Sequence, residues 1–152
     1  MGLDDIYKEV ILDHYKSPRN KRELTGATFR CTANNPLCGD EITVFANVAD
    51  ARVTEVTFQG AGCSISQSSA SMMTEAVAGK SVDDAKQMAT DFRGMMAGEI
   101  DPSEDTFGEL VALKGVVKYP IRIKCAVLAW DVLQDALDGA GEASGVRPHS
   151  IG

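Results

Sequence analysis

The segment 34–40, with the sequence NNPLCGD, places a thiol and a carboxylate two residues apart between two strand-like stretches. Pro36 interrupts the first stretch, and Gly39 permits a tight backbone turn between Cys38 and Asp40. A cysteine and an aspartate on one turn are a pair of potential metal ligands. This turn is therefore the feature around which we interpret the rest of the chain.

Two more cysteines, Cys63 and Cys125, are each expected to begin a helix-like segment. The free N–H groups and the positive dipole end of a helix favour a thiolate there. We hypothesise that Cys38, Asp40, Cys63 and Cys125 meet around one metal ion. The intervals between them are not those of a zinc finger, so spacing alone also allows scattered core cysteines.

The choice of the fourth ligand leaves two alternatives open. Cys31 is a rival fourth ligand, but its alternation with Phe29 and Ala33 favours a buried core thiol. Asp40 could instead cap its own turn, as aspartates often do. As a ligand among thiolates, a carboxylate would leave more readily than a sulfur, and that lability suits a transfer site.

The periodicity of the chain predicts an α+β domain with a three-stranded antiparallel meander. The predicted strands are residues 27–34, 41–49 and 53–59. The glycine-rich run 60–62 is interpreted as a flexible elbow before the next helix. Helices are expected at residues 3–15, 64–78, from Ser81 to about Gly98, at 120–138, and as a short helix within the acidic segment 99–119.

The two ends of the chain carry the two histidines. His14 follows the apolar stripe of the first helix, and we interpret it as a helix-end histidine rather than a ligand. Residues 139–152, with His149, lose all periodicity and are expected to form a disordered tail. The remaining residues, 1–138, are predicted to form a single domain.

Composition excludes several classes of protein. The chain has 152 residues and a net charge of −7, which argues against nucleic acid as the main partner and suits a partner with a basic patch. No secretory signal and no long apolar run is present, so we expect a cytoplasmic protein with no membrane span. Cysteines in the cytosol are more often ligands or nucleophiles than disulfides.

Three segments together resemble the iron–sulfur cluster assembly family typified by IscU. They are residues 34–40, residues 58–66 (FQGAGCSIS) and residues 123–126 (IKCA), and the likeness extends over most of residues 1–138. Within the family the chain is more similar to the SufU branch. Lys124 stands where IscU-type scaffolds carry a histidine, and residues 118–122 (KYPIR) stand in place of their chaperone-binding motif.

The resemblance implies a SufE/IscU-like α/β sandwich, with a three-stranded antiparallel sheet covered by helices on one side. It also implies Zn²⁺ held by Cys38, Asp40, Cys63 and Cys125. Cys38 would accept persulfide sulfur from a pyridoxal-phosphate cysteine desulfurase of the SufS type. The implied activity is that of a zinc-dependent sulfurtransferase that supplies a downstream SufBCD-type scaffold.

Two basic residues close to the last cysteine bear on this interpretation. Arg122 and Lys124 are expected to add positive charge that supports a thiolate or persulfide, although both could simply be solvated. A charged lysine has no free lone pair for a metal, so Lys124 weakens the case for a bound cluster. The alternatives are a scaffold that binds a transient iron–sulfur cluster and a small domain with a structural zinc.

Overall fold

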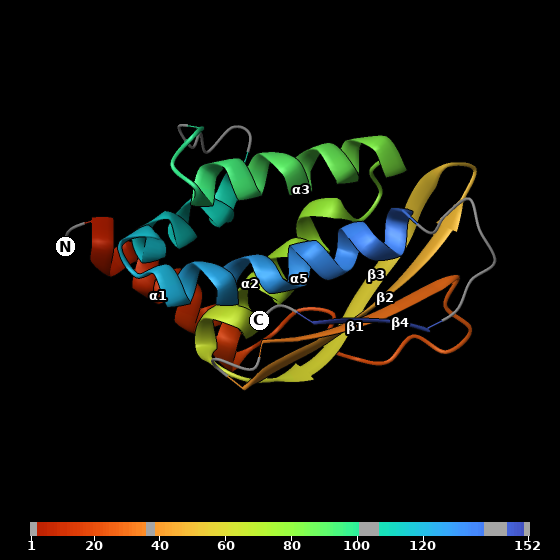
Figure 1. The fold of residues 1–152 in the computed structure, drawn as a ribbon, viewed down its shortest axis with the longest axis horizontal. Coiled ribbons are helices and arrows are strands. Elements are labelled where there is room, and N and C mark those ends of the chain that lie inside the picture. The colour runs from red at the N-terminus through yellow and green to blue at the C-terminus, as the bar shows by residue number, and fades with distance from the viewer. Residues whose placement is uncertain (1–2, 36–38, 101–106, 139–145, 151–152) are drawn as a thin grey trace.

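The computed structural model describes residues 3–35, 39–100, 107–138 and 146–150 (Figure 1). The elements follow the predicted order, with one added strand at the end. They are α1 (Leu3–Lys16), β1 (Phe29–Asn35), β2 (Asp40–Ala49), β3 (Arg52–Ala61), α2 (Ser64–Val77), α3 (Val82–Met96), the 3₁₀-helix η1 (Gly108–Lys118), α5 (Pro120–Asp138) and β4 (Val146–Ser150).

Strands β1, β2 and β3 form the predicted antiparallel meander. Asn35 pairs with Asp40, so the connection between β1 and β2 consists of residues 36–39 alone. Ala49 pairs with Arg52, which leaves a two-residue hairpin turn between β2 and β3. Both turn residues have positive φ, 52° and 61°, as a type I′ turn requires. The sheet thus brings the start of β2 beside the end of β3.

The sheet has a fourth strand, in the order β3-β2-β1-β4. Strand β4 runs parallel to β1, with Val146 opposite Arg30 and Ser150 opposite Asn34. This strand corrects the expectation of a disordered tail for residues 146–150. The segment VRPHS has no apolar alternation to predict a strand, and a proline is tolerated at a sheet edge. Residues 139–145 and 151–152 lie outside the described residues.

The helices cover one face of the sheet in two layers (Figure 1). Helix α5 packs on β1 and β2, and α2 packs on β3. Helix α3 packs on α5, while α1 and η1 pack on α2. The predicted class, an α+β fold with an antiparallel sheet under helices, is confirmed. None of the helices in the described ranges combines the length and apolar character that a membrane span needs.

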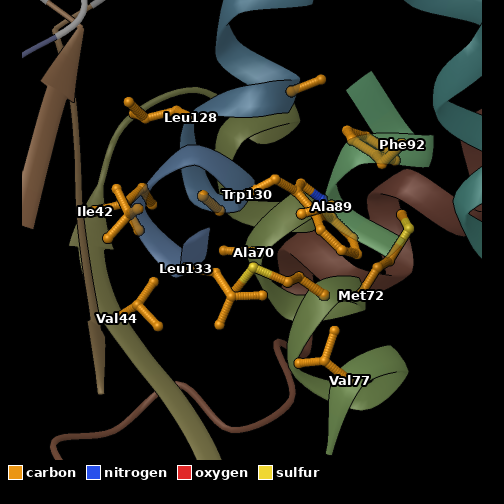
Figure 2. Close-up of a cluster of buried hydrophobic side chains, with 14 of the residues drawn as sticks. Ile42, Val44, Ala70, Met72, Val77, Ala89, Phe92, Leu128, Trp130 and Leu133 are labelled. Carbon is orange, nitrogen blue, oxygen red and sulfur yellow. The ribbon is translucent and has the colours of Figure 1, made fainter. Parts of the chain in front are cut away.

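The core between these layers fixes the position of α5. Figure 2 shows Ile42 and Val44 of β2 on the side of the sheet that faces α5. On the other side of α5, Trp130 stacks on Phe92 of α3 with ring centroids 4.8 Å apart. Burial of a large apolar side chain contributes about 1.5–3 kcal/mol, so a few such residues hold α5 firmly between the sheet and α3. Any residue on the buried face of α5 is thereby placed accurately.

Candidate metal centre

Asp40 is the first residue of β2, and its side chain is almost fully buried, at 1% exposure. Its Oδ1 atom accepts the backbone N–H of Cys63 at 2.8 Å. This bond joins the β1–β2 turn to the elbow between β3 and α2. The alternative of a turn carboxylate that caps only its own backbone is therefore not what the structure shows. One carboxylate oxygen is held in place, and the other, Oδ2, lies 3.7 Å from the Cys63 sulfur.

The glycine-rich run before Cys63 is closely packed. A Cβ added at Gly62 would lie 2.2 Å from Oδ1 of Asp40, and Gly62 has φ of +149°. A Cβ at Gly60 would lie 2.1 Å from the carbonyl oxygen of Glu41. Close packing, rather than flexibility, therefore explains the glycines at these two positions. These glycines are needed because the start of β2 approaches their backbone.

Cys63 is the N-cap residue of α2, as the sequence predicted. Its sulfur accepts the backbone N–H of Ser66 at 3.5 Å, and its side chain is partly exposed. The free N–H groups and the dipole of α2 favour the thiolate form at this position. Cys63 is therefore a suitable soft ligand that still reaches the surface.

Cys125 lies in the second turn of α5, five residues after Pro120, and is fully buried. The expectation that it begins the helix is corrected, and the helix dipole supports its thiolate less because that effect fades beyond the first turn. Its Sγ donates to the carbonyl oxygen of Ile121 at 3.5 Å. Next to it, Ser69 of α2 donates to the carbonyl oxygen of Ala126 at 2.6 Å, which ties the two helices together at the level of Cys125.

The ligand atoms of Asp40, Cys63 and Cys125 all lie within 4.8 Å of one another. A tetrahedral zinc ion with sulfur at ~2.3 Å and oxygen at ~2.1 Å separates these two atoms by roughly 3.6 Å. The distance of 3.7 Å between the Cys63 sulfur and Oδ2 of Asp40 agrees with that value. Two sulfurs with one carboxylate form a donor set that fits zinc well.

The other two cysteines, Cys31 and Cys38, are not among the three residues of this cluster, for different reasons. Cys31 is fully buried on β1, as predicted, and is not one of its members. Cys38 lies outside the described residues, so its role as a ligand stays a prediction. The residues on either side of segment 36–38 are joined, since the N–H of Gly39 donates to the carbonyl oxygen of Asn35 at 2.9 Å.

A pocket of about 480 Å³ opens beside the cluster, lined by Cys63, Tyr119, Ile121 and Arg122. Tyr119 and Ile121 are 59% and 58% exposed, so apolar surface of this pocket faces solvent. Arg122 lines this pocket together with Cys63, and its role in supporting a thiolate or persulfide stays a prediction. The pocket's described lining does not include Lys124, which is half-buried on α5.

Two positioning residues of this centre, Gly62 and Ser69, were not predicted from the sequence. The signal for Gly62 was present, because a glycine directly before a helix N-cap is compatible with a close backbone approach. Ser69 belongs to a run of small polar residues in α2 that are fully buried, and a buried hydroxyl requires a partner. Nothing in the spacing identified Ala126 as that partner.

The fold is that of a known class of protein. Residues 6–126 match the model of the NifU-like N-terminal domain. The chain therefore belongs to the family of NifU-like N-terminal domains.

Individual relatives agree with that assignment. The chain is 47% identical over 134 residues to a Bacillus subtilis protein named zinc-dependent sulfurtransferase SufU, a match that covers 88% of this chain and 90% of the relative. It is 37% identical over 149 residues to the iron–sulfur cluster assembly scaffold protein IscU of Streptococcus pyogenes, covering 98% and 93%.

Solved structures share the fold. A crystal structure of a hypothetical protein superposes with a TM-score of 0.83 at 40% identity, over 90% of this chain and 99% of that one. The FiSufU protein of Fervidobacterium islandicum, described as a candidate iron–sulfur cluster assembly scaffold for the SUF system, superposes with a TM-score of 0.81 at 33% identity, with the same coverage.

Proposed function

We propose that this chain is a zinc-dependent sulfurtransferase of iron–sulfur cluster assembly, with Cys38 as the sulfur acceptor. The observation that carries the proposal is the convergence of the Asp40 carboxylate with the sulfurs of Cys63 and Cys125 beside an open pocket. The sulfurtransferase name of the 47% identical relative from Bacillus subtilis supports the same assignment.

Zinc would be held by Cys38, Asp40, Cys63 and Cys125. Bound there, it would keep the cysteines deprotonated at neutral pH without taking part in redox chemistry. The described residues already hold the site in shape. The backbone N–H of Cys63 fixes one oxygen of Asp40, and the bond from Ser69 to Ala126 fixes α5 against α2. Such supporting bonds commonly tune a metal site by roughly 10- to 100-fold in affinity.

The transfer itself is a thiol exchange at sulfur. The Cys38 thiolate attacks the terminal sulfur of a persulfide on the partner, the partner's S–S bond breaks, and the partner's cysteine leaves as a thiolate. Cys38 then carries the persulfide. Arg122, which lines the pocket beside Cys63, would stabilise the negative charge of the attacking and product sulfur.

The partner would be a pyridoxal-phosphate cysteine desulfurase of the SufS type, in the cytoplasm. A flexible loop that carries its persulfide could enter the pocket between Tyr119 and Cys63, and the exposed rings and chains there offer apolar contact. The net charge of −7 suits a partner with a basic docking patch. A downstream SufBCD-type scaffold would receive the sulfur.

A desulfurase assay with metal analysis tests this function. We expect about one zinc ion per chain. We also expect the wild-type protein to stimulate the desulfurase and Cys38→Ala to have lost this stimulation. Cys31→Ser is the matched control, because it removes a cysteine from the core rather than from the cluster, and it should retain both properties.

The second candidate function is a scaffold that binds a transient iron–sulfur cluster. The IscU relative from Streptococcus pyogenes, 37% identical over nearly the whole chain, favours it. Lys124 beside Cys125 counts against it, because a charged lysine is not a metal ligand. A brown, oxygen-sensitive product that reconstitutes an apo-ferredoxin, with no stimulation of a desulfurase, would decide for the scaffold.

A further inference from the structure

A second group of potential ligands lies away from the cysteines, where α1, α2 and η1 meet. It consists of His14, Glu75 and Glu109, whose ligand atoms all lie within 4.8 Å of one another. The sequence analysis interpreted His14 as a helix-end histidine without a ligand role. In the structure its side chain has 0% exposure, while the two glutamates are 48% and 55% exposed.

Both carboxylates lie close to the same nitrogen of the imidazole. Nε2 of His14 lies 3.1 Å from Oε1 of Glu109 and 4.0 Å from Oε1 of Glu75. A single N–H group satisfies one of these carboxylates well and leaves the other charge without a close donor from the ring. A hydrogen bond between His14 and Glu109 therefore does not account for the second carboxylate at the same nitrogen.

The other ring nitrogen is hydrogen-bonded to a serine of α2. Nδ1 of His14 lies 2.8 Å from Oγ of Ser71, which also accepts the backbone N–H of Arg19 at 2.8 Å. A hydroxyl oxygen has two lone pairs, so Ser71 can accept from Nδ1–H as well. That tautomer leaves Nε2 with a free lone pair toward the glutamates. Metal-binding histidines are typically oriented by such a bond from their second nitrogen.

The distance between His14 and Glu109 fits a metal ion with oxygen and nitrogen ligands. An imidazole nitrogen and a carboxylate oxygen, each ~2.1 Å from an octahedral ion and adjacent in its shell, lie roughly 3.0 Å apart. The distance between Nε2 and the Glu109 oxygen is 3.1 Å. A pocket of about 190 Å³, lined by Glu75, Glu109, Met72 and Phe107 among others, borders the group and has room for water ligands.

The local cation does not replace a metal at this position. Arg19 is close enough for both Glu75 and Glu109 to contribute to the raised pKa of its guanidinium, but the main cause is its hydrogen bond with Asp13. That bond, at 2.7 Å, directs the end of the guanidinium group to Asp13 instead.

We propose that His14, Glu75 and Glu109 form a second metal site, which binds a divalent transition-metal ion through one imidazole nitrogen and two carboxylates. Water fills the remaining positions, and the half-exposed carboxylates provide the entry from solvent. Because the site has no sulfur, it suits harder ions such as Mn²⁺ or Fe²⁺ better than the cysteine centre does. The bound ion would join α1, α2 and η1.

Mn²⁺ is the probe that separates the two sites, since thiolates bind it poorly. Titration of the full-length protein, with free Mn²⁺ followed by electron paramagnetic resonance, should show one saturable site. Loss of a supporting group alone commonly costs a metal site roughly 10-fold, so Glu75→Gln and Glu109→Gln should each weaken binding at least about 10-fold. Cys63→Ser should leave Mn²⁺ binding unchanged.

Glu9→Gln is the matched control, because Glu9 is an exposed glutamate of α1 and the charge change is identical. Mn²⁺ should also raise the thermal midpoint of the wild type and of Glu9→Gln but not that of Glu75→Gln. Glu75 makes only the longer contact, so its variant keeps the hydrogen bond between His14 and Glu109. Equal Mn²⁺ affinity in Glu9→Gln, Glu75→Gln and Glu109→Gln would overturn the proposal and leave a hydrogen-bonded contact only. The absence of saturable binding, or loss of binding in Cys63→Ser, would overturn it as well.

Discussion

Replacement of Gly62 by alanine should damage the metal centre without touching any ligand. The new Cβ would lie 2.2 Å from Oδ1 and 2.9 Å from Cα of Asp40, so β2 and the elbow must move apart. The bond of Asp40 to the N–H of Cys63, now 2.8 Å, would then be lost. A hydrogen bond to a charged group is worth about 1.5–3 kcal/mol, and loss of an orienting bond lowers metal affinity by roughly 10- to 100-fold.

Gly79→Ala is the control for the backbone contribution. Gly79 also has a positive φ, +84°, but an added Cβ there would meet nothing within 4 Å. Zinc affinity, measured by competition with a chromophoric chelator, should fall in Gly62→Ala and stay at the wild-type level in Gly79→Ala. Urea unfolding should show a loss for both variants, larger for Gly62→Ala. Equal zinc affinity in the two variants would refute the idea that close packing at Gly62 positions Asp40.

Three further predictions concern other parts of the chain. Cys31→Ser should leave the zinc content unchanged. It should lower the free energy of unfolding by roughly 1–3 kcal/mol, since it buries a hydroxyl in the core. A loss of zinc in elemental analysis would show that Cys31 is a ligand. Ser69→Ala should cost about 1 kcal/mol in urea unfolding, because it removes the bond to the carbonyl of Ala126, and a variant as stable as wild type would show that this bond does not hold α5. The hydrogen bond from Arg19 is the main cause that lowers the pKa of Asp13. Its stabilising effect should therefore be complete above the ordinary aspartate pKa and disappear as the pH falls through the lowered value. A titration of Asp13 by nuclear magnetic resonance should move to higher pH in Arg19→Ala, and an unmoved titration would contradict the assigned cause.

The local pattern of the sequence was sufficient for most of the fold. Alternation of apolar and polar residues identified the strands of the meander. Strand β1 shows this alternation in its burial, whereas residues 42–46 of β2 are buried on both faces. The sequence predicts a helix that starts at Ser81, and the Ser81 hydroxyl caps that helix by accepting the N–H of Asp84 at 3.0 Å. These features depend on neighbours within a few residues, and such neighbours can be read from the chain directly.

Features that depend on contacts through space were not predictable in this way. Gly62 is required because Asp40 approaches it from another strand, and His14 is buried because α2 and η1 cover it. Strand β4 has no pattern of its own and follows the edge of β1. The ligand set was a hypothesis that residue types and helix starts suggested, and the family resemblance strengthened it. The spacing of Cys63 and Cys125 alone gave no reason to bring them together.

The position of the transferred sulfur decides whether Cys38 is the acceptor. The zinc-loaded protein is incubated with a SufS-type desulfurase and cysteine, alkylated, digested and mapped by mass spectrometry. We predict one added sulfur atom on the peptide that contains Cys38, and none on the peptides with Cys31, Cys63 or Cys125. Sulfur found on Cys63 or Cys125 while Cys38 remains unmodified would contradict the proposed function.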